Sequence, residues 1–208
     1  MQERFVLFDF DGVIADSYAL AFDVARQFNP ELNDESYRAL FEGNIYESLG
    51  RLEGWDSKNH PDQYAAAFNS RMKDEVGLAP GMRETIEKLA GEYRLIVISS
   101  TISMSIREFL DSHRLLKYFT QVMGMDVHTS KAEKMRMLFK KYDTAAEHCI
   151  FITDTLGDMR EAQEHRMGTI GCSWGVHSHE TLSKGIPFRI VDKPLELPDA
   201  VADYFARE

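Results

Sequence analysis

A short apolar segment near the N-terminus ends in two carboxylates. Residues 4–10 read RFVLFDF, so Asp9 closes the run and Asp11 and Gly12 follow it. A nearly continuous apolar run bounded by a turn is typical of a strand buried on both faces, as in a parallel sheet covered by helices on both sides. The two acids would then lie at the carboxyl end of the strand, where open α/β sheets bind ligands. The segment therefore predicts both a fold class and the position of a site.

Short apolar runs recur along the rest of the chain and alternate with segments of helical spacing. From Pro80 onward this alternation predicts an α/β fold with a doubly wound parallel sheet. The later runs are residues 95–99, 122–125, 149–153, 169–172 and 188–191.

The stretch between the first run and Pro80 has a different pattern. Residues 17–79 show helical spacing and no strand-like run. We therefore expect a core made of residues 1–16 and 80–208, with a small all-helical cap, residues 17–79, inserted after the first strand. Because ligands bind at the carboxyl ends of the strands, we expect the cap to act as a lid over that edge.

The charge of the chain limits its partners. It carries 34 acidic and 24 basic residues, a formal net charge of −10. This balance argues against a nucleic-acid partner and against binding to an anionic membrane surface. No apolar run approaches the about 20 residues of a membrane span, and the first residues do not resemble a signal peptide. An anionic substrate must therefore be attracted locally, by a metal ion, a lysine or a helix N-terminus.

The cysteines and two of the histidines suggest little chemistry. Two cysteines, Cys149 and Cys172, are too few for a disulfide framework, and we expect buried, inert thiols in a cytoplasmic protein. His177 and His179 have no neighbouring acids or cysteines, so we expect them in a surface loop rather than on a metal.

The carboxylates and hydroxyls near the first two runs suggest a phosphate site. Two carboxylates as close as Asp9 and Asp11 repel each other unless a cation lies between them, and Mg²⁺ prefers such oxygen ligands. The alternative interpretation is a turn in which both acids are solvated. Ser99, Ser100 and Thr101 follow the second run and open a helical segment. Free N–H groups and a hydroxyl at a helix start can bind phosphate, although a plain N-cap would explain the same residues.

Two later features complete this set. Lys131 starts a helical pattern, where a cation opposes the helix dipole unless an anion lies nearby. Lys134 is the competing lysine, and we expect it to be a solvated surface residue. Asp154 and Asp158 follow the run at 149–153 and are four residues apart. That spacing can place one acid on a metal and use the other to orient its ligands.

In this order, the four features resemble the haloacid dehalogenase superfamily, which has a Rossmann-like core and, in one type, a helical cap after the first motif. The stretch from Cys172 to Leu182 is similar to that of its phosphoglycolate-phosphatase-like members. The family usually has Gly where this chain has Thr153, and the Lys-Pro-x-Pro often seen at its third motif is absent. The choice between Lys131 and Lys134 therefore stays open. The resemblance covers the chain and rests on four motifs: Asp9-x-Asp11-Gly12, Ser99, Lys131 and Asp154-x-x-x-Asp158.

The resemblance implies a Mg²⁺-dependent phosphatase that hydrolyses a small phosphomonoester metabolite. It makes Asp9 the nucleophile that forms an aspartyl-phosphate and Asp11 the general acid and base, a role that dehalogenation would not need. Lys131 would neutralise the phosphoryl group. Its oxygens would be bound by residues of the first two motifs: Gly12, Ser99, Ser100 and Thr101. Mg²⁺ would be held by Asp9, Asp11 through its carbonyl, and Asp154, with Asp158 orienting its ligands.

Substrate selectivity is expected to come from the cap. The turn at residues 43–47 offers Asn44 and Tyr46 as substrate contacts, unless Tyr46 packs between cap helices. One alternative function is a sugar-phosphate mutase, but the Arg that such enzymes typically carry after the Gly of this turn is missing. Another is a non-catalytic binding protein, against which four intact motifs argue. We expect a monomer or a homodimer.

Overall fold

The computed structural model describes residues 2–52 and 60–207. Within these ranges six strands form one parallel sheet in the order β3–β2–β1–β4–β5–β6, which confirms the doubly wound α/β fold. Most of the expected strands lie within a residue or two of their predicted positions. The exception is the strand expected at 122–125, which begins at Phe119, three residues before the predicted start. Thr120 and Gln121 interrupt its apolar pattern. The strands are β1 (Phe5–Phe8), β2 (Arg94–Ile98), β3 (Phe119–Met123), β4 (Cys149–Thr153), β5 (Gly168–Cys172) and β6 (Arg189–Val191).

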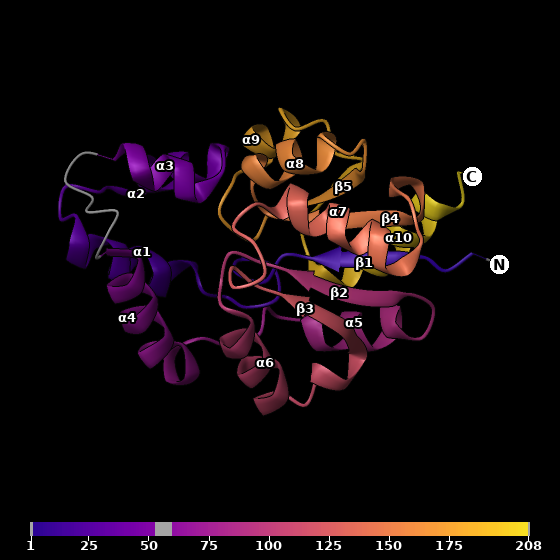
Figure 1. Cartoon of the computed structure of the whole chain (residues 1–208), viewed down its shortest axis with the longest axis horizontal. Coiled ribbons are helices and arrows are strands. Elements are labelled where there is room, and N and C mark those ends of the chain that lie inside the picture. The colour runs from indigo at the N-terminus through magenta and orange to yellow at the C-terminus, as the bar shows by residue number, and fades with distance from the viewer. Residues whose placement is uncertain (1, 53–59, 208) are drawn as a thin grey trace.

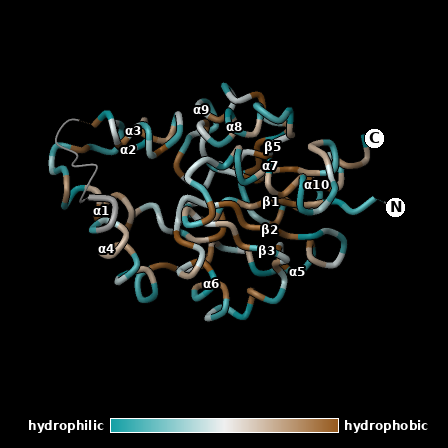
Figure 2. Tube along the Cα trace, in the orientation of Figure 1, coloured by the Kyte–Doolittle hydropathy of each residue, from teal (hydrophilic) through white to brown (hydrophobic). Residues whose placement is uncertain are grey.

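Helices cover both faces of the sheet. Phe5 and Leu7 of β1 pack on one face beneath α7 (Lys131–Tyr142) and α8 (Leu156–Gln163). Val6 and Phe8 face the other side, which is covered by α5 (Met82–Ala90), α6 (Ser103–Ser112) and α10 (Leu197–Phe205). Successive residues of a central strand are buried on opposite faces of the sheet, so these strands are apolar throughout. Figure 2 shows this as the hydrophobic colour of β1 and β2.

The cap consists of helices inserted between β1 and α5. They are α1 (Tyr18–Phe28), α2 (Asp34–Ala39), α3 (Ile45–Arg51) and α4 (His60–Glu75), with a 3₁₀ turn at Leu40–Glu42. In Figure 1 they lie beyond the carboxyl ends of the strands, at the opposite end of the molecule from both chain termini. The cap has a small apolar cluster of its own, formed by Ala25, Leu32, Tyr37 and Leu40.

The cap rests directly on the core at the start of α8. A Cβ atom on Gly157 would lie 2.2 Å from the carbonyl oxygen of Gly43, so the two backbones approach as closely as only glycine allows. Arg160, on the same helix, donates a hydrogen bond to the carbonyl of Glu42. These contacts hold the 3₁₀ turn of the cap above the ends of the strands.

The short helix α9 (His179–Ser183) was not expected from the sequence, which suggested a loop. Ser178 begins it by accepting a hydrogen bond from the N–H of Thr181. In the part of the chain that the structure describes, no helix combines the length and the apolar character needed to cross a membrane.

Candidate active site

The site lies where the order of the strands reverses, between β1 and β4. Asp9 follows β1 and Asp154 follows β4, and the two strands are neighbours in register from Phe5 to Phe8. The N–H of Asp9 donates to the carbonyl of Ile152 at 2.9 Å, which extends this pairing to the acid itself. Parallel topology thus brings together two acids that are far apart in the sequence, at the position where open α/β sheets bind ligands.

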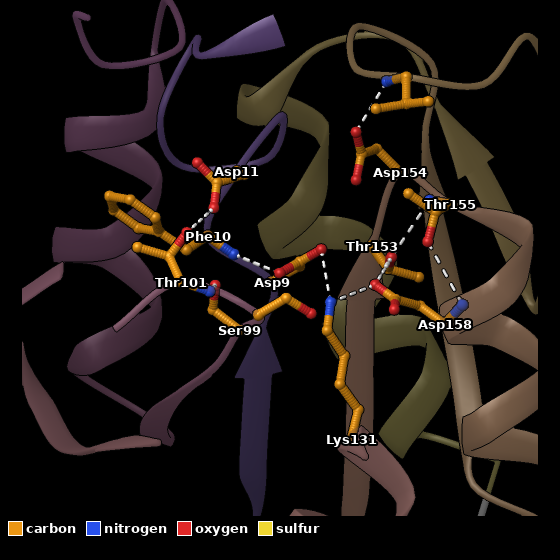
Figure 3. Close-up of polar contacts among 12 residues, drawn as sticks. Asp9, Phe10, Asp11, Ser99, Thr101, Lys131, Thr153, Asp154, Thr155 and Asp158 are labelled. Carbon is orange, nitrogen blue, oxygen red and sulfur yellow. Dashed lines mark hydrogen bonds and ion pairs between the residues drawn. The ribbon is translucent and has the colours of Figure 1, made fainter. Parts of the chain in front are cut away.

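Lys131 connects the first and last of the four motifs. Figure 3 shows that its Nζ contacts both Asp9 and Asp158. The distances are 2.8 Å to Oδ2 of Asp9 and 2.6 Å to Oδ2 of Asp158. Burial alone would lower the pKa of Lys131, but the two carboxylates outweigh it and raise the pKa above its ordinary value. Lys131 therefore stays charged and is the lysine in contact with the Asp9 carboxylate.

The expectation that Lys134 is a solvated surface residue is wrong. Its side chain is fully buried, and its Nζ donates to the carbonyls of Ser99 at 2.5 Å and Gly124 at 3.3 Å. The spacing of three residues places it on the same face of α7 as Lys131, which is turned toward the sheet. Burial lowers the pKa of Lys134 to about 8. Lys134 thus holds the backbone that carries Ser99.

Both carboxylate oxygens of Asp11 accept hydrogen bonds from hydroxyl groups. Ser17 donates to Oδ1 at 2.8 Å and Thr101 donates to Oδ2 at 2.6 Å. The N–H of Thr101 in turn donates to the buried hydroxyl of Ser99 at 2.9 Å. Burial raises the pKa of Asp11, partly offset by the two hydroxyls. The two hydroxyl groups fix the orientation of the carboxyl group, and burial shifts its pKa in the direction that a general acid requires.

Asp154 has a buried oxygen without a partner. Its Oδ2 accepts from the N–H of Val176 at 2.7 Å, whereas Oδ1 has no hydrogen-bond partner among the residues the structure describes. A Cβ at Gly12 (φ +73°) would lie 2.1 Å from Oδ2, and one at Gly175 would lie 2.2 Å from it, so both glycines make room for this carboxylate. Burial raises the pKa of Asp154 to about 7. A cation would satisfy the unpaired oxygen and reverse this shift.

The residues at the site suit Mg²⁺ better than a metal ion that is held by three or more protein side chains. No group of three acidic, histidine or cysteine side chains converges on one point within residues 2–52 and 60–207. Mg²⁺ commonly binds through one or two carboxylates and keeps several waters. Asp9 and Asp154 offer two such carboxylates at adjacent strand ends, which matches this requirement.

Thr153, the departure from the family pattern, fixes Asp158. Its hydroxyl donates to Oδ2 of Asp158 at 2.6 Å, the same oxygen that Lys131 contacts. Burial would raise the pKa of Asp158, but Lys131 and the hydrogen bonds lower it, so the carboxylate stays ionised. Asp158 therefore acts as the counter-ion of Lys131.

Asn44 and Tyr46 both line the cavity over the site, but their polar groups are already engaged. Oδ1 of Asn44 accepts from the N–H groups of Tyr46 and Glu47, which makes it the N-cap of α3. The hydroxyl of Tyr46 donates to the carbonyl of Ser100 at 2.7 Å, so Tyr46 reaches from the cap to the core rather than packing between cap helices. Their role in selectivity stays a prediction.

The expectation of a surface position for His177 is wrong, whereas His179 is exposed at the start of α9. Nδ1 of the buried His177 accepts from the N–H of Leu156 at 2.9 Å, so Nε2 carries the proton and donates to the carbonyl of Arg38 in the cap. His177 therefore joins α8 to the cap.

Cys149 and Cys172 are buried free thiols, as predicted.

Glu161 is a site residue that the sequence did not indicate. Its Oε1 accepts from the N–H of Lys131 at 2.9 Å and from the hydroxyl of Ser130 at 3.0 Å, and so it fixes the start of α7. The Nδ2 of Asn44 lies 3.4 Å from the same oxygen. A single glutamate on α8 has no motif of its own, so only the packing of α7 against α8 reveals this role.

Comparison with known proteins agrees with this geometry. A family model described as "haloacid dehalogenase-like hydrolase" matches residues 6–172. A phosphoglycolate phosphatase from Vibrio parahaemolyticus is 25% identical, covering 96% of both chains. A 5'-nucleotidase from Pseudomonas aeruginosa is 25% identical, covering 85% of this chain and 86% of the relative. The structure of a haloacid dehalogenase-like hydrolase from Streptococcus pneumoniae superposes with a TM-score of 0.77 at 20% identity, covering 96% of this chain and 98% of the other.

Proposed function

Because the chain belongs to the haloacid dehalogenase-like hydrolase family, we propose that it is a Mg²⁺-dependent phosphatase that hydrolyses a small phosphomonoester through an aspartyl-phosphate. The observation that carries the proposal is the buried ion-pair cluster in which Lys131 contacts both Asp9 and Asp158. Asp11, held by two hydroxyl groups, lies two residues from Asp9. The cluster combines a nucleophile, a cation and an acid in the way that phosphoryl transfer requires.

Asp9 is oriented for attack on phosphorus. Its Oδ1 accepts from the N–H of Phe10 at 2.7 Å while Oδ2 contacts Lys131. In the first step an oxygen of Asp9 forms a bond to phosphorus, and the bond to the leaving alcohol oxygen breaks as Asp11 donates a proton to it. In the second step Asp11 takes a proton from water, which attacks the phosphoryl group and releases phosphate and free Asp9.

The strand ends offer ligands for a cation. Asp9, the carbonyl of Asp11 and Asp154 would hold it, with Asp158 orienting these ligands, and when bound it would neutralise charge on the phosphoryl oxygens. The unpaired Oδ1 of Asp154 supports this assignment. Lys131 supplies the second positive charge, which answers how a protein of net charge −10 attracts an anionic substrate.

The remaining features extend the proposal. The core would comprise residues 1–16 and 80–208 and the cap residues 17–79. We propose a cytoplasmic location, which the two buried free thiols support, and a monomeric or homodimeric state. The relatives named for phosphoglycolate and for nucleotides share phosphomonoester hydrolysis, which supports the reaction class rather than one substrate.

The test is release of inorganic phosphate. We expect the purified chain with Mg²⁺ to hydrolyse p-nitrophenyl phosphate and a panel of phosphorylated metabolites, and to form a covalent phosphoenzyme that acid quenching traps. Binding of the same esters without phosphate release would contradict the proposal and favour a binding protein.

Replacing Lys131 or Lys134 by methionine distinguishes the catalytic role of the first from the structural role of the second. Lys131→Met should lower kcat by on the order of 10²- to 10³-fold, because an electrostatic contact to the reacting groups is lost. Lys134→Met leaves the carbonyls of Ser99 and Gly124 without donors, which should cost about 1–3 kcal/mol of stability and affect kcat less. Steady-state kinetics and thermal melting measure both effects. A larger loss of kcat in Lys134→Met than in Lys131→Met would reverse the assignment.

A further inference from the structure

A cavity of about 360 Å³ extends from the proposed catalytic groups into the cap. Its inner end is lined by Asp9, Asp11 and Lys131. A cavity of roughly 150 Å³ holds one benzene ring, so this cavity has room for a phosphoryl group and one or two rings. The cap contributes six aromatic side chains beside smaller apolar ones, and the six are Tyr18, Tyr37, Phe41, Tyr46, Tyr64 and Phe68.

The aromatic side chains brace one another in fixed orientations. Tyr37 and Phe41 meet edge to face, with ring centroids 5.3 Å apart, and Tyr64 and Phe68 are parallel at 6.2 Å. Burial raises the pKa of Tyr37 and of Tyr64, so the phenols stay neutral. Rigid, neutral aromatic walls favour a flat apolar ring over a flexible polar chain.

The charges along the cavity disfavour a second anionic group. Among the described residues that line it, Lys131 is the one cation, and it is already paired with Asp9 and Asp158. The other charged lining residues, Asp11 and Glu161 included, are acids. An ester whose alcohol carries a carboxylate would bury that charge beside other carboxylates without a partner.

Asn69, on α4, adds one polar group to the apolar end. It lines the cavity, and its buried Oδ1 has no hydrogen-bond partner within the part of the chain that the structure describes. An unpaired buried acceptor is costly, and an N–H or O–H group of a bound ligand would satisfy it.

We infer that the leaving group is an uncharged alcohol that carries an aromatic ring and a hydrogen-bond donor on or near that ring. The ring lies among Tyr37, Phe41 and Phe68, and the donor binds Oδ1 of Asn69. The inference rests on the proposed phosphatase function and narrows its substrate class. It sets the chain apart from phosphoglycolate hydrolysis, because the alcohol released there carries a carboxylate.

The test compares kcat/KM for esters that differ in one property. Ethyl phosphate and 2-phenylethyl phosphate differ in the ring, and 2-phosphoglycolate adds a negative charge to a similar short chain. We expect 2-phenylethyl phosphate to exceed ethyl phosphate by at least about 10-fold, since even one methylene group in an apolar pocket is discriminated by roughly 10- to 200-fold. Phosphoglycolate should be the poorest of the three.

Two variants assign the effect to the cavity. Phe41→Ala should reduce the preference for the phenyl ester over the ethyl ester by about 10-fold. Phe22→Ala is the matched control, because its ring contacts Tyr37 at 5.1 Å but does not line the cavity, and it should keep the preference. An equal loss of preference in both variants would overturn the placement of the ring.

The donor is tested with 3- and 4-hydroxyphenylethyl phosphates. At least one should exceed 2-phenylethyl phosphate by about fivefold or more, and Asn69→Leu should remove that gain. No gain for either ester would overturn the role of Asn69. Phosphoglycolate as the best substrate would overturn the inference alone, whereas hydrolysis of no ester, p-nitrophenyl phosphate included, would overturn the proposed function and the inference with it.

Discussion

Asp9→Asn is expected to abolish turnover, with a loss on the order of 10⁴-fold or more, because the amide cannot form the covalent bond to phosphorus. The buried site should otherwise persist, since asparagine keeps the oxygen that accepts from the N–H of Phe10. Intact-protein mass spectrometry after acid quenching should find no added phosphoryl group. A variant that still forms the phosphoenzyme at the normal rate would show that Asp9 is not the nucleophile.

Asp11→Asn is the matched control for this experiment. It keeps the nucleophile and loses acid–base catalysis, which is commonly worth ~10²–10⁴-fold. With p-nitrophenyl phosphate, whose leaving group needs no proton, the first step should survive and the second should not. The phosphoenzyme should therefore accumulate in Asp11→Asn and be absent in Asp9→Asn. Equal loss of the phosphoenzyme in both variants would contradict the separate roles.

The sheet and the position of the site were predictable because each depends on a local pattern. β1 and β4 are buried on both faces, so each is an apolar run, and Asp9 and Asp154 follow where the runs end. Parallel topology then places the two acids at one edge. β3 was located less well because the exposed Thr120 lies inside it, and an exposed residue interrupts the apolar pattern.

The corrected residues depend on contacts between distant segments. Lys134 has the sequence context of a surface lysine, and its partners, the carbonyls of Ser99 and Gly124, are known only once α7 is packed against the sheet. His177 likewise takes its partners from Leu156 and Arg38. No local pattern in the sequence encodes either arrangement.

The cavity beneath the cap also could not be predicted from the sequence. Aromatic residues at helical spacing predict packing, and Phe22 does contact its neighbours Tyr18 and Tyr37. Phe41 has the same spacing and also contacts Tyr37, but in addition it lines the cavity above the site. Whether an aromatic side chain of the cap lines the cavity depends on how the cap sits on the core. The contact of Gly157 with Gly43 sets that position.

Removal of divalent cations is expected to have the second largest effect. Excess chelator should abolish phosphate release, and Mg²⁺ should restore it, because Asp9 and Asp154 otherwise repel an anionic ester. Ca²⁺, with its larger and looser coordination, should inhibit. Full activity in excess chelator would contradict the cation site.

A second readout of the cation does not require activity. Mg²⁺ at about 100-fold over its Kd should stabilise the fold by about 2.7 kcal/mol, which for a chain of this size corresponds to roughly 5–10 °C in Tm. Asp154→Asn should lose most of this increment, because it replaces the carboxylate whose Oδ1 is unpaired. An unchanged increment in Asp154→Asn would place the cation elsewhere.

The increment in Tm should also depend on pH, with a sign that follows from burial. Without metal, burial raises the pKa of Asp154 to about 7, above the unfolded value of roughly 3.9. The stability that protonated Asp154 contributes is complete below the unfolded pKa and is lost as pH rises through the folded pKa. Mg²⁺ binds the ionised carboxylate and removes this loss, so its increment should grow between pH 5 and about pH 8.

The lowered pKa of Asp158 acts in the opposite sense, but its window lies below about pH 4 and does not overlap. Differential scanning fluorimetry with and without Mg²⁺ across this range checks the slope. An increment that shrinks with rising pH would show that Asp154 does not bind the cation.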